Sequence, residues 1–210
     1  MEQIVRKEPV TFTDFLRKTF KNVLEPVAMF FNRLGIMPNT MTILGLVGNV
    51  FGAVLLALGH IPAGGVVILL MGPIDALDGT MARLRGLSSE FGAFVDSVTD
   101  RYSELVIFLG LLIYFLREDL WLGVLMVYLA AAGSVLVSYI RARAQSVGFE
   151  TKIGLFTRVE RFLVLVPGLI FNQPIISLAL IAFFGNITAL QRIWHVRKQA
   201  YERTTVKREG

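Results

Sequence analysis

Apolar residues in this chain occur in long runs, and this arrangement limits the possible folds more than any other feature. Short polar or charged connections separate six such runs, which cover about residues 38–58, 63 into the 75–78 region, 92–115, 120–139, 162–171 and 175–190. A helical run of roughly 20 apolar residues matches the ~30 Å hydrocarbon layer of a bilayer. The pattern therefore predicts an all-α integral membrane protein with six transmembrane helices.

The fifth run is too short to cross that layer by itself. We expect its helix to begin before Arg161 and to carry this charge into the bundle. Residues 11–34 differ from all six runs, because basic residues interrupt their apolar positions at helical spacing. This predicts an amphipathic helix in the membrane interface, with a soluble helix packed on a partner as the alternative.

The resulting organisation has three parts. Residues 1–36 form an N-terminal segment that contains the interfacial helix, residues 37–196 form the membrane domain, and residues 197–210 form a basic tail. Asn39 is placed to cap the first membrane helix.

The distribution of charge predicts the orientation in the membrane. Six spans would leave 20 of the 21 lysines and arginines on one side, with Arg117 opposite. The positive-inside rule makes that side cytoplasmic, together with both termini. The net charge of +5 therefore reflects orientation and predicts no nucleic-acid partner. The chain has no cysteine, which excludes disulfides, thiolate metal sites and cysteine nucleophiles.

Four carboxylates stand between apolar runs, where each is costly. An Asp at the middle of a spanning helix costs roughly 2.5 to 3.5 kcal/mol on insertion scales, which favours a functional role. Asp75 and Asp78 are three residues apart, and Asp96 and Asp100 are four apart, so each pair shares a helix face. Four converging carboxylates require a cation, and hard oxygen ligands favour Mg²⁺, with Mn²⁺ tolerated. Helix caps and interfacial ion pairs are the structural alternative.

Two further residues in this stretch suit a metal-bound diphosphate. Gly79 leaves room for a ligand beside the helix, and Arg83 lies one turn further along, where it can pair with phosphate oxygens. The full pattern, D-x2-D-G-x2-A-R-x8-G-x3-D-x3-D, resembles that of the CDP-alcohol phosphotransferase family, and all of its positions are present: Asp75, Asp78, Gly79, Ala82, Arg83, Gly92, Asp96 and Asp100.

The resemblance implies a membrane enzyme that joins an alcohol to the β-phosphate of a CDP-linked lipid and releases CMP. By position, Asp75, Asp78 and Asp96 would be metal ligands, and Asp100 would be the base that also touches metal. Gly79, Ala82 and Arg83 would line the nucleotide, as would Asp75 and Asp78. Asn39 and Thr42, which resemble the contacts from the family's first helix, would bind it as well. The resemblance also implies a homodimer in a prokaryotic cell membrane with its active site on the cytoplasmic side.

A second group of basic residues bears on the acceptor alcohol. Arg161 and Arg192 adjoin apolar sequence that would bury them, so a basic pocket for a phosphorylated acceptor is more plausible than arginines that only flank spans. This region resembles the phosphatidylinositol phosphate synthases of the family, which implies inositol 1-phosphate as acceptor and CDP-diacylglycerol, or its ether analogue CDP-archaeol, as donor. The acceptor phosphate would then lie against Ser138, Arg161 and Arg192, with Arg141, Arg143 and Arg158 in support.

Two alternatives remain open. Phosphatidylglycerophosphate synthases also take a phosphorylated acceptor, glycerol 3-phosphate, although they usually have Lys where this chain has Arg101. A divalent-cation or proton-coupled transporter could also hold aspartates in the membrane. A transporter would be expected to show paired half-chain repeats, and the aspartate pattern has no second copy.

Overall fold

The computed structural model describes residues 12–87, 89–151 and 153–209, without the side chains of residues 12–21, 75 and 206–209. Within these ranges every regular element is an α-helix, as predicted. The helices are α1 (Phe12–Arg33), α2 (Pro38–Ala57), α3 (Ile61–Leu84), α4 (Glu90–Arg117), α5 (Trp121–Ser146), α6 (Arg158–Ile170) and α7 (Pro174–Glu209). Residues 1–11 of the predicted N-terminal segment lie outside the described residues.

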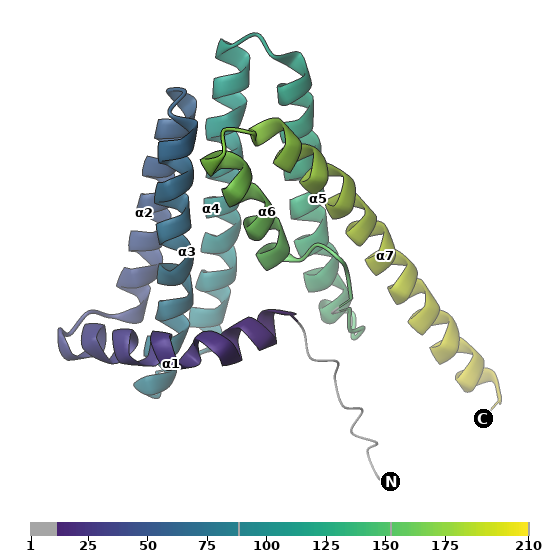
Figure 1. Cartoon of the computed structure of the whole chain (residues 1–210). Helices are drawn as coiled ribbons and strands as arrows, with labels where there is room; N and C mark the ends of the chain where they lie inside the picture. The colour runs from purple at the N-terminus through teal and green to yellow at the C-terminus, as the bar shows by residue number, and fades with distance from the viewer. Residues whose placement is uncertain (1–11, 88, 152, 210) are drawn as a thin grey trace.

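Helices α2 to α7 form an up-and-down bundle, and α1 lies across one end of it (Figure 1). α2 packs against both α3 and α4, and α5 packs mainly against α7. The connections between α3 and α4 and between α5 and α6 lie at the α1 end, and the turn between α4 and α5 lies at the opposite end. The bundle therefore has a clear polarity, with the predicted site residues near the α1 end.

Four helices in the described ranges are long and apolar enough to cross a membrane: α2, α3, α5 and α7. Large apolar side chains on these helices face outward; Phe51, Leu122 and Phe183 are 57%, 60% and 62% exposed. A surface of this kind is suited to lipid and confirms a multi-pass membrane protein. α6 has only 13 residues, and α4 carries charged residues beside its apolar part, so the count of six spans stays a prediction.

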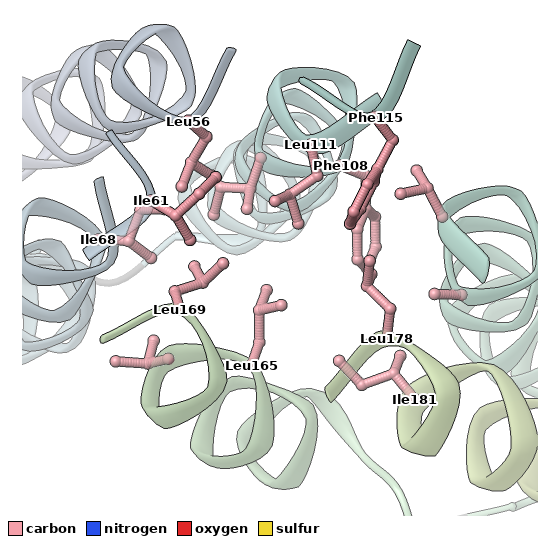
Figure 2. Close-up of a cluster of buried hydrophobic side chains, with 14 of the residues drawn as sticks. Leu56, Ile61, Ile68, Phe108, Leu111, Phe115, Leu165, Leu169, Leu178 and Ile181 are labelled. Atoms are coloured by element: carbon pink, nitrogen blue, oxygen red, sulfur yellow. The ribbon is translucent and has the colours of Figure 1, made fainter. Parts of the chain in front are cut away.

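Figure 2 shows the larger of the two buried hydrophobic clusters, which includes residues near the turn between α4 and α5, at the end of the bundle opposite α1 in Figure 1. Leu56 of α2, Ile68 of α3, Leu111 of α4, Leu169 of α6 and Leu178 of α7 all contribute fully buried side chains. The short α6 thus lies between α3 and α7 and packs its apolar side against this cluster. This core holds in place the helix ends that carry the polar residues described below.

α1 is attached to the end of α3 that follows the aspartates. Ala28 packs with Met41, Leu77 and Met81 in a second buried cluster. Asn32 Nδ2 donates to the carbonyl of Met81 at 3.4 Å. The predicted helix is therefore present and packs on the bundle, while its position in a membrane interface stays a prediction.

Two helix ends differ from the sequence expectation. The predicted cap at Asn39 is wrong, because α2 begins at Pro38 and its N-cap position is Met37, which makes no side-chain cap bond. Proline at the first position needs no partner for an N–H group, so this helix starts without a polar cap. α7 continues to Glu209 and includes most of the segment 197–210 that the sequence separates as a tail.

α2 and α4 approach each other closely at Gly110. A methyl group at this position would overlap the carbonyl oxygen of Ala53 and lie 2.9 Å from its Cα. Small residues commonly allow such contacts between membrane helices. The close approach of α2, which carries Thr42, and α4, which carries Asp100, therefore depends on Gly110.

We predict that Gly110→Ala destabilises the protein, because overpacking in a well-packed interior costs about 1–3 kcal/mol. For a chain of this size each kcal/mol lowers the midpoint of thermal unfolding by roughly 2–4 °C. The matched control is Gly185→Ala on α7, where the nearest atom to the new methyl would be 3.8 Å away. Equal midpoints for the two variants in detergent would contradict the close contact.

Candidate active site

Asp78 of α3 contacts Thr42 of α2, which joins a predicted metal ligand to a predicted nucleotide contact. Both residues are buried, with exposed fractions of 5%. Thr42 Oγ1 donates to Asp78 Oδ2 at 2.5 Å, and the Gly79 N–H donates to Asp78 Oδ1 at 2.5 Å. These donors orient a carboxylate whose burial would otherwise be costly.

The other predicted nucleotide residues lie on the same two helices. Arg83 is exposed and donates from Nη2 to Thr80 Oγ1 at 2.9 Å. A Cβ atom at Gly79 would lie 3.5 Å from Arg83 Nη1, so the missing side chain leaves space beside the guanidinium. Ala82 is half-buried on α3, and Asn39 is exposed in the first turn of α2. Small and basic residues therefore surround the position of Asp78.

Asp96 and Asp100 belong to the first turns of α4. Ser89 caps this helix by accepting a hydrogen bond from the Gly92 N–H at 3.0 Å. Asp96 is half-buried, and Asp100 is 7% exposed. Arg158 of α6 places its Nη1 2.5 Å from Asp100 Oδ2. The predicted base is thus in direct contact with a residue of the predicted acceptor pocket.

The described side chains do not show the four predicted metal ligands together in one site. The side chain of Asp75 lies outside them, although its backbone belongs to α3. Within the described side chains, no three His, Cys, Asp or Glu residues form a group that could hold a metal ion. The four-carboxylate metal site therefore stays a prediction.

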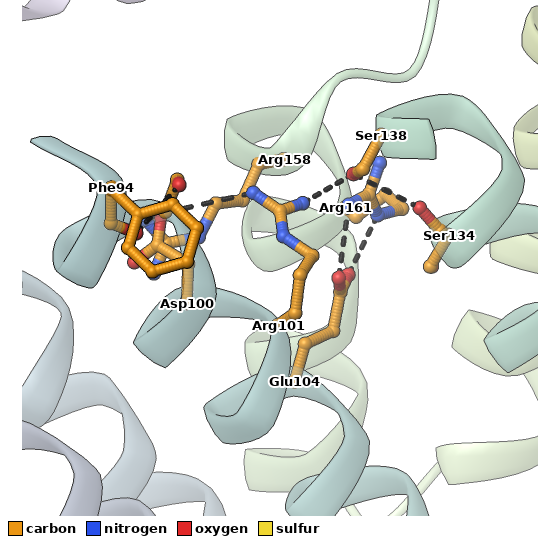
Figure 3. Close-up of polar contacts among 9 residues, drawn as sticks. Phe94, Asp100, Arg101, Glu104, Ser134, Ser138, Arg158 and Arg161 are labelled. Carbon is orange, nitrogen blue, oxygen red and sulfur yellow. Dashed lines mark hydrogen bonds and ion pairs between the residues drawn. The ribbon is translucent and has the colours of Figure 1, made fainter. Parts of the chain in front are cut away.

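Arg161 and Glu104 form a buried ion pair between α6 and α4 (Figure 3). Arg161 Nε lies 2.7 Å from Glu104 Oε1, and Arg161 Nη2 lies 3.0 Å from Glu104 Oε2. Its Nη1 also donates to the carbonyl of Phe156 at 3.3 Å. Arg161 is 2% exposed, which confirms the prediction that its helix carries this charge into the bundle.

Arg101 contacts Ser138, the acceptor residue predicted on α5. Its Nη1 donates to Ser138 Oγ, and Ser138 Oγ donates to the carbonyl of Ser134 at 3.2 Å. Figure 3 shows these contacts beside the Asp100–Arg158 and Glu104–Arg161 pairs. Polar side chains from α4, α5 and α6 therefore form one continuous group.

Arg192 of α7 is also buried, with 2% exposure. Its Nε donates to the carbonyl of Ile153 at 2.9 Å, and its Nη1 donates to the carbonyl of Val137 at 2.5 Å. Arg141 and Arg143 are exposed on the last turns of α5, and Arg143 donates to Ser146 Oγ at 3.2 Å. The predicted acceptor residues thus fall into a buried set with protein acceptors and an exposed set that solutes can reach.

Sequence reasoning missed two members of this group. Glu104 follows Asp96 and Asp100 at four-residue intervals, so a search along that helix face would have found it. From the sequence, Arg101 is notable only because phosphatidylglycerophosphate synthases usually have Lys at this position. Its contact with Ser138 depends on how α4 and α5 pack. Glu104 balances the charge of Arg161, whereas Arg101 adds a further positive charge beside Asp100.

Comparisons with known proteins point to one enzyme family. The profile of the CDP-alcohol phosphatidyltransferase family matches residues 35–194. The archaetidylinositol phosphate synthase of Pyrococcus horikoshii is 33% identical over 186 residues, which are 88% of this chain and 96% of that protein. The phosphatidylinositol phosphate synthase of Streptomyces avermitilis is 34% identical over an alignment of 205 positions, which covers 90% of this chain and 83% of that protein.

Solved structures of a related protein have the same fold. The crystal structure of Mycobacterium tuberculosis phosphatidylinositol phosphate synthase with CDP-DAG bound has a TM-score of 0.76 and 32% identity, and the match covers 83% of this chain and 94% of that one. The same enzyme in complex with manganese and citrate has a TM-score of 0.77 and 32% identity, with coverage of 82% and 88%.

The buried Arg161–Glu104 pair predicts strong coupling between the two residues. Removing one partner leaves a buried charge, which costs about 3–5 kcal/mol, whereas replacing both with apolar residues costs much less. We expect Arg161→Met and Glu104→Leu each to lower thermal stability clearly, and the double variant to recover most of the loss. Unfolding midpoints of the four proteins give the coupling energy. Additive losses would contradict a direct pair.

Proposed function

This chain belongs to the CDP-alcohol phosphatidyltransferase family, and we propose that it transfers the phosphatidyl group of CDP-diacylglycerol to inositol 1-phosphate, giving phosphatidylinositol phosphate and CMP. Relatives at 33–34% identity carry the names of inositol phosphate lipid synthases, and one solved structure of such an enzyme contains CDP-DAG. The Pyrococcus relative is an archaetidyl enzyme, so CDP-archaeol is the alternative donor.

The observation that carries this proposal is the contact between Asp100 and Arg158. Inositol 1-phosphate presents a hydroxyl group and a phosphate on one small ring. Its binding therefore requires a base and a phosphate ligand side by side. An acceptor without any anionic group, such as free inositol, gives no reason for a group of arginines around the base.

The proposed pocket for the acceptor phosphate comprises one serine and five arginines from α5, α6 and α7: Ser138, Arg141, Arg143, Arg158, Arg161 and Arg192. The half-buried Arg158 and the exposed Arg141 and Arg143 can reach a solute directly. The buried Arg161 and Arg192 add positive charge and hold the surrounding backbone through their hydrogen bonds. Guanidinium groups suit this task because they bind phosphate through two parallel hydrogen bonds.

Asp75, Asp78, Asp96 and Asp100 are the residues that would hold divalent metal. The burial of Asp78 and Asp100 supports this metal site. Their carboxylates are 5% and 7% exposed, and they belong to α3 and α4, which both pack against α2. Hard oxygen donors suit Mg²⁺, with Mn²⁺ as a substitute. Divalent metal bound there supplies positive charge that neutralises the diphosphate and orients it.

The reaction is a direct displacement. The acceptor hydroxyl oxygen forms a bond to the β-phosphorus, which belongs to the phosphate that bears diacylglycerol. At the same time the bond between this phosphorus and the bridging oxygen breaks, and this oxygen leaves with CMP. Asp100 accepts the hydroxyl proton, and CMP leaves with the bonding electron pair. Asn39, Thr42, Gly79, Ala82 and Arg83 bind the cytidine nucleotide and hold the leaving group. Because phosphoryl transfer depends mainly on positioning and charge, no covalent nucleophile is required.

The site lies at the cytoplasmic side of a prokaryotic cell membrane, with six spans and α1 in the interface. The concentration of lysines and arginines at the α1 end of the bundle supports this orientation. Both termini then face the cytoplasm, where a soluble phosphorylated acceptor is available. The family resemblance further supports a homodimer.

The direct test measures CMP release from CDP-diacylglycerol with Mg²⁺ and four acceptors: inositol 1-phosphate, glycerol 3-phosphate, free inositol and serine. We expect turnover with inositol 1-phosphate and loss of turnover when a chelator removes the metal. Turnover with glycerol 3-phosphate alone would identify a phosphatidylglycerophosphate synthase instead.

Asp100→Asn should remove the base while keeping the size of the side chain. Because a general base contributes about 10²–10⁴-fold, we expect kcat to fall by at least 10² with little change in the affinity for CDP-diacylglycerol. Asp119→Asn is the matched control, since Asp119 is exposed in the turn at the other end of α4. Turnover of Asp100→Asn near the wild-type rate would exclude Asp100 as the base.

A further inference from the structure

The described residues of the loop between α5 and α6, 147–151 and 153–157, are held along one face of α7. Side-chain atoms of Thr188, Arg192, Gln199 and Arg203 contact its backbone. These positions are 4, 7 and 4 residues apart, so they form one stripe on the helix. The loop and α7 run in opposite directions, because the earliest loop residue contacts the latest helix residue.

The half of this stripe nearer the bundle is buried. The Phe156 N–H donates to Thr188 Oγ1 at 3.0 Å, and Arg192 Nε donates to the carbonyl of Ile153 at 2.9 Å. Gly154 has a φ of 137° and packs so closely on Thr188 that an added methyl group would overlap its Cγ2 atom. Two buried side chains of α7 therefore contact the part of the loop that is nearer to α6.

The outer half of the stripe lies beyond the apolar part of α7. Gln199 Nε2 donates to the carbonyl of Glu150 at 2.6 Å. Arg203 Nη2 donates to the carbonyl of Gly148, and its guanidinium lies 4.3 Å from the centre of the Phe149 ring. A helix of 36 residues is about 54 Å long, which exceeds the ~30 Å hydrocarbon layer by several turns. Those additional turns supply both contacts.

The loop leads directly into the residues that bind the acceptor in the proposed function. Its last residue, Thr157, is the N-cap of α6 and is followed by Arg158, which contacts Asp100. Arg161, one turn later, pairs with Glu104 and donates to the loop carbonyl of Phe156. A shift of the loop would therefore move the first turn of α6 relative to the base.

We propose that Gln199 and Arg203 are positioning residues, which hold the α5–α6 loop on α7 and thereby set the acceptor-binding arginines at the start of α6 against Asp100. The assignment rests on the proposed function. Neither residue touches substrate. Their effect reaches the acceptor through the loop backbone, whereas the nucleotide residues on α2 and α3 are not connected to this loop by the contacts described above.

The test is steady-state kinetics of the full-length double variant Gln199→Ala/Arg203→Ala, with each substrate varied at a saturating level of the other. We expect the KM for inositol 1-phosphate to rise about tenfold, since small misplacements of binding groups are costly. The KM for CDP-diacylglycerol and kcat should each stay within about twofold, because groups that bind the donor and the base itself are unchanged. Amide hydrogen exchange in residues 148–156 should become faster.

Two further variants separate positioning from a general loss of stability. Arg203→Lys keeps a cation over Phe149 and a donor for Gly148, so its acceptor KM should return to within about threefold of wild type. Arg197→Ala removes an exposed arginine from another face of α7, where it lies over Trp194, and should leave the acceptor KM unchanged.

An acceptor KM within twofold of wild type in the double variant would overturn the proposal, as would an equal rise in the donor KM or the same rise in Arg197→Ala. If the double variant does not fold, the single variants Gln199→Ala and Arg203→Ala take its place. In each, the rise in the acceptor KM is compared with the change in the donor KM. Wild-type turnover with glycerol 3-phosphate alone would refute the proposed function, and the positioning role would then be measured with that acceptor.

Discussion

Charge buried in an apolar bundle must be balanced by nearby charge or hydrogen bonds, and this constraint organises the structure around α4 and α6. Arg158 and Arg161, at the start of α6, pair with Asp100 and Glu104 on α4. These pairs join the helix that carries the predicted base to a helix of only 13 residues. The rest of α6 packs into the buried cluster of the bundle through Leu165 and Leu169. Polar pairing therefore fixes the start of α6, and core packing fixes the remainder.

The same constraint explains why two helices differ from ordinary membrane spans. α4 carries Asp100, Arg101 and Glu104 at the margin of its apolar part, and α6 begins with charge inside the protein. Such residues face the bundle interior, where partners are available, whereas Phe51 and Leu122 on α2 and α5 face outward. Among the described helices of the bundle, α4 and α6 are therefore the two that resemble lipid-spanning segments least.

The helices and the faces that carry the aspartates can be predicted from the sequence. The contacts between helices cannot, because they depend on how the helices pack. The spacing of the aspartates and the apolar runs predicts helices with carboxylates on common faces, and the apolar residues after Arg161 predict its burial. The partner Glu104 was missed because pairing across helices depends on how α4 and α6 pack. The predicted cap at Asn39 failed because Pro38 can begin a helix without one. α7 continues beyond its apolar run because contacts with the α5–α6 loop support the added turns.

The contacts between α7 and that loop depend on the residue type on the helix much more than on the residue type in the loop. On the helix they need particular side chains, such as Gln199 and Arg203, but on the loop they use mainly backbone carbonyls, which every residue has. Glu150 and Ile153 can therefore be exchanged for other residues without losing these hydrogen bonds, provided that the turns at Gly148 and Gly154 are kept. The loop is free to change its surface chemistry over evolutionary time while its path along the helix is preserved.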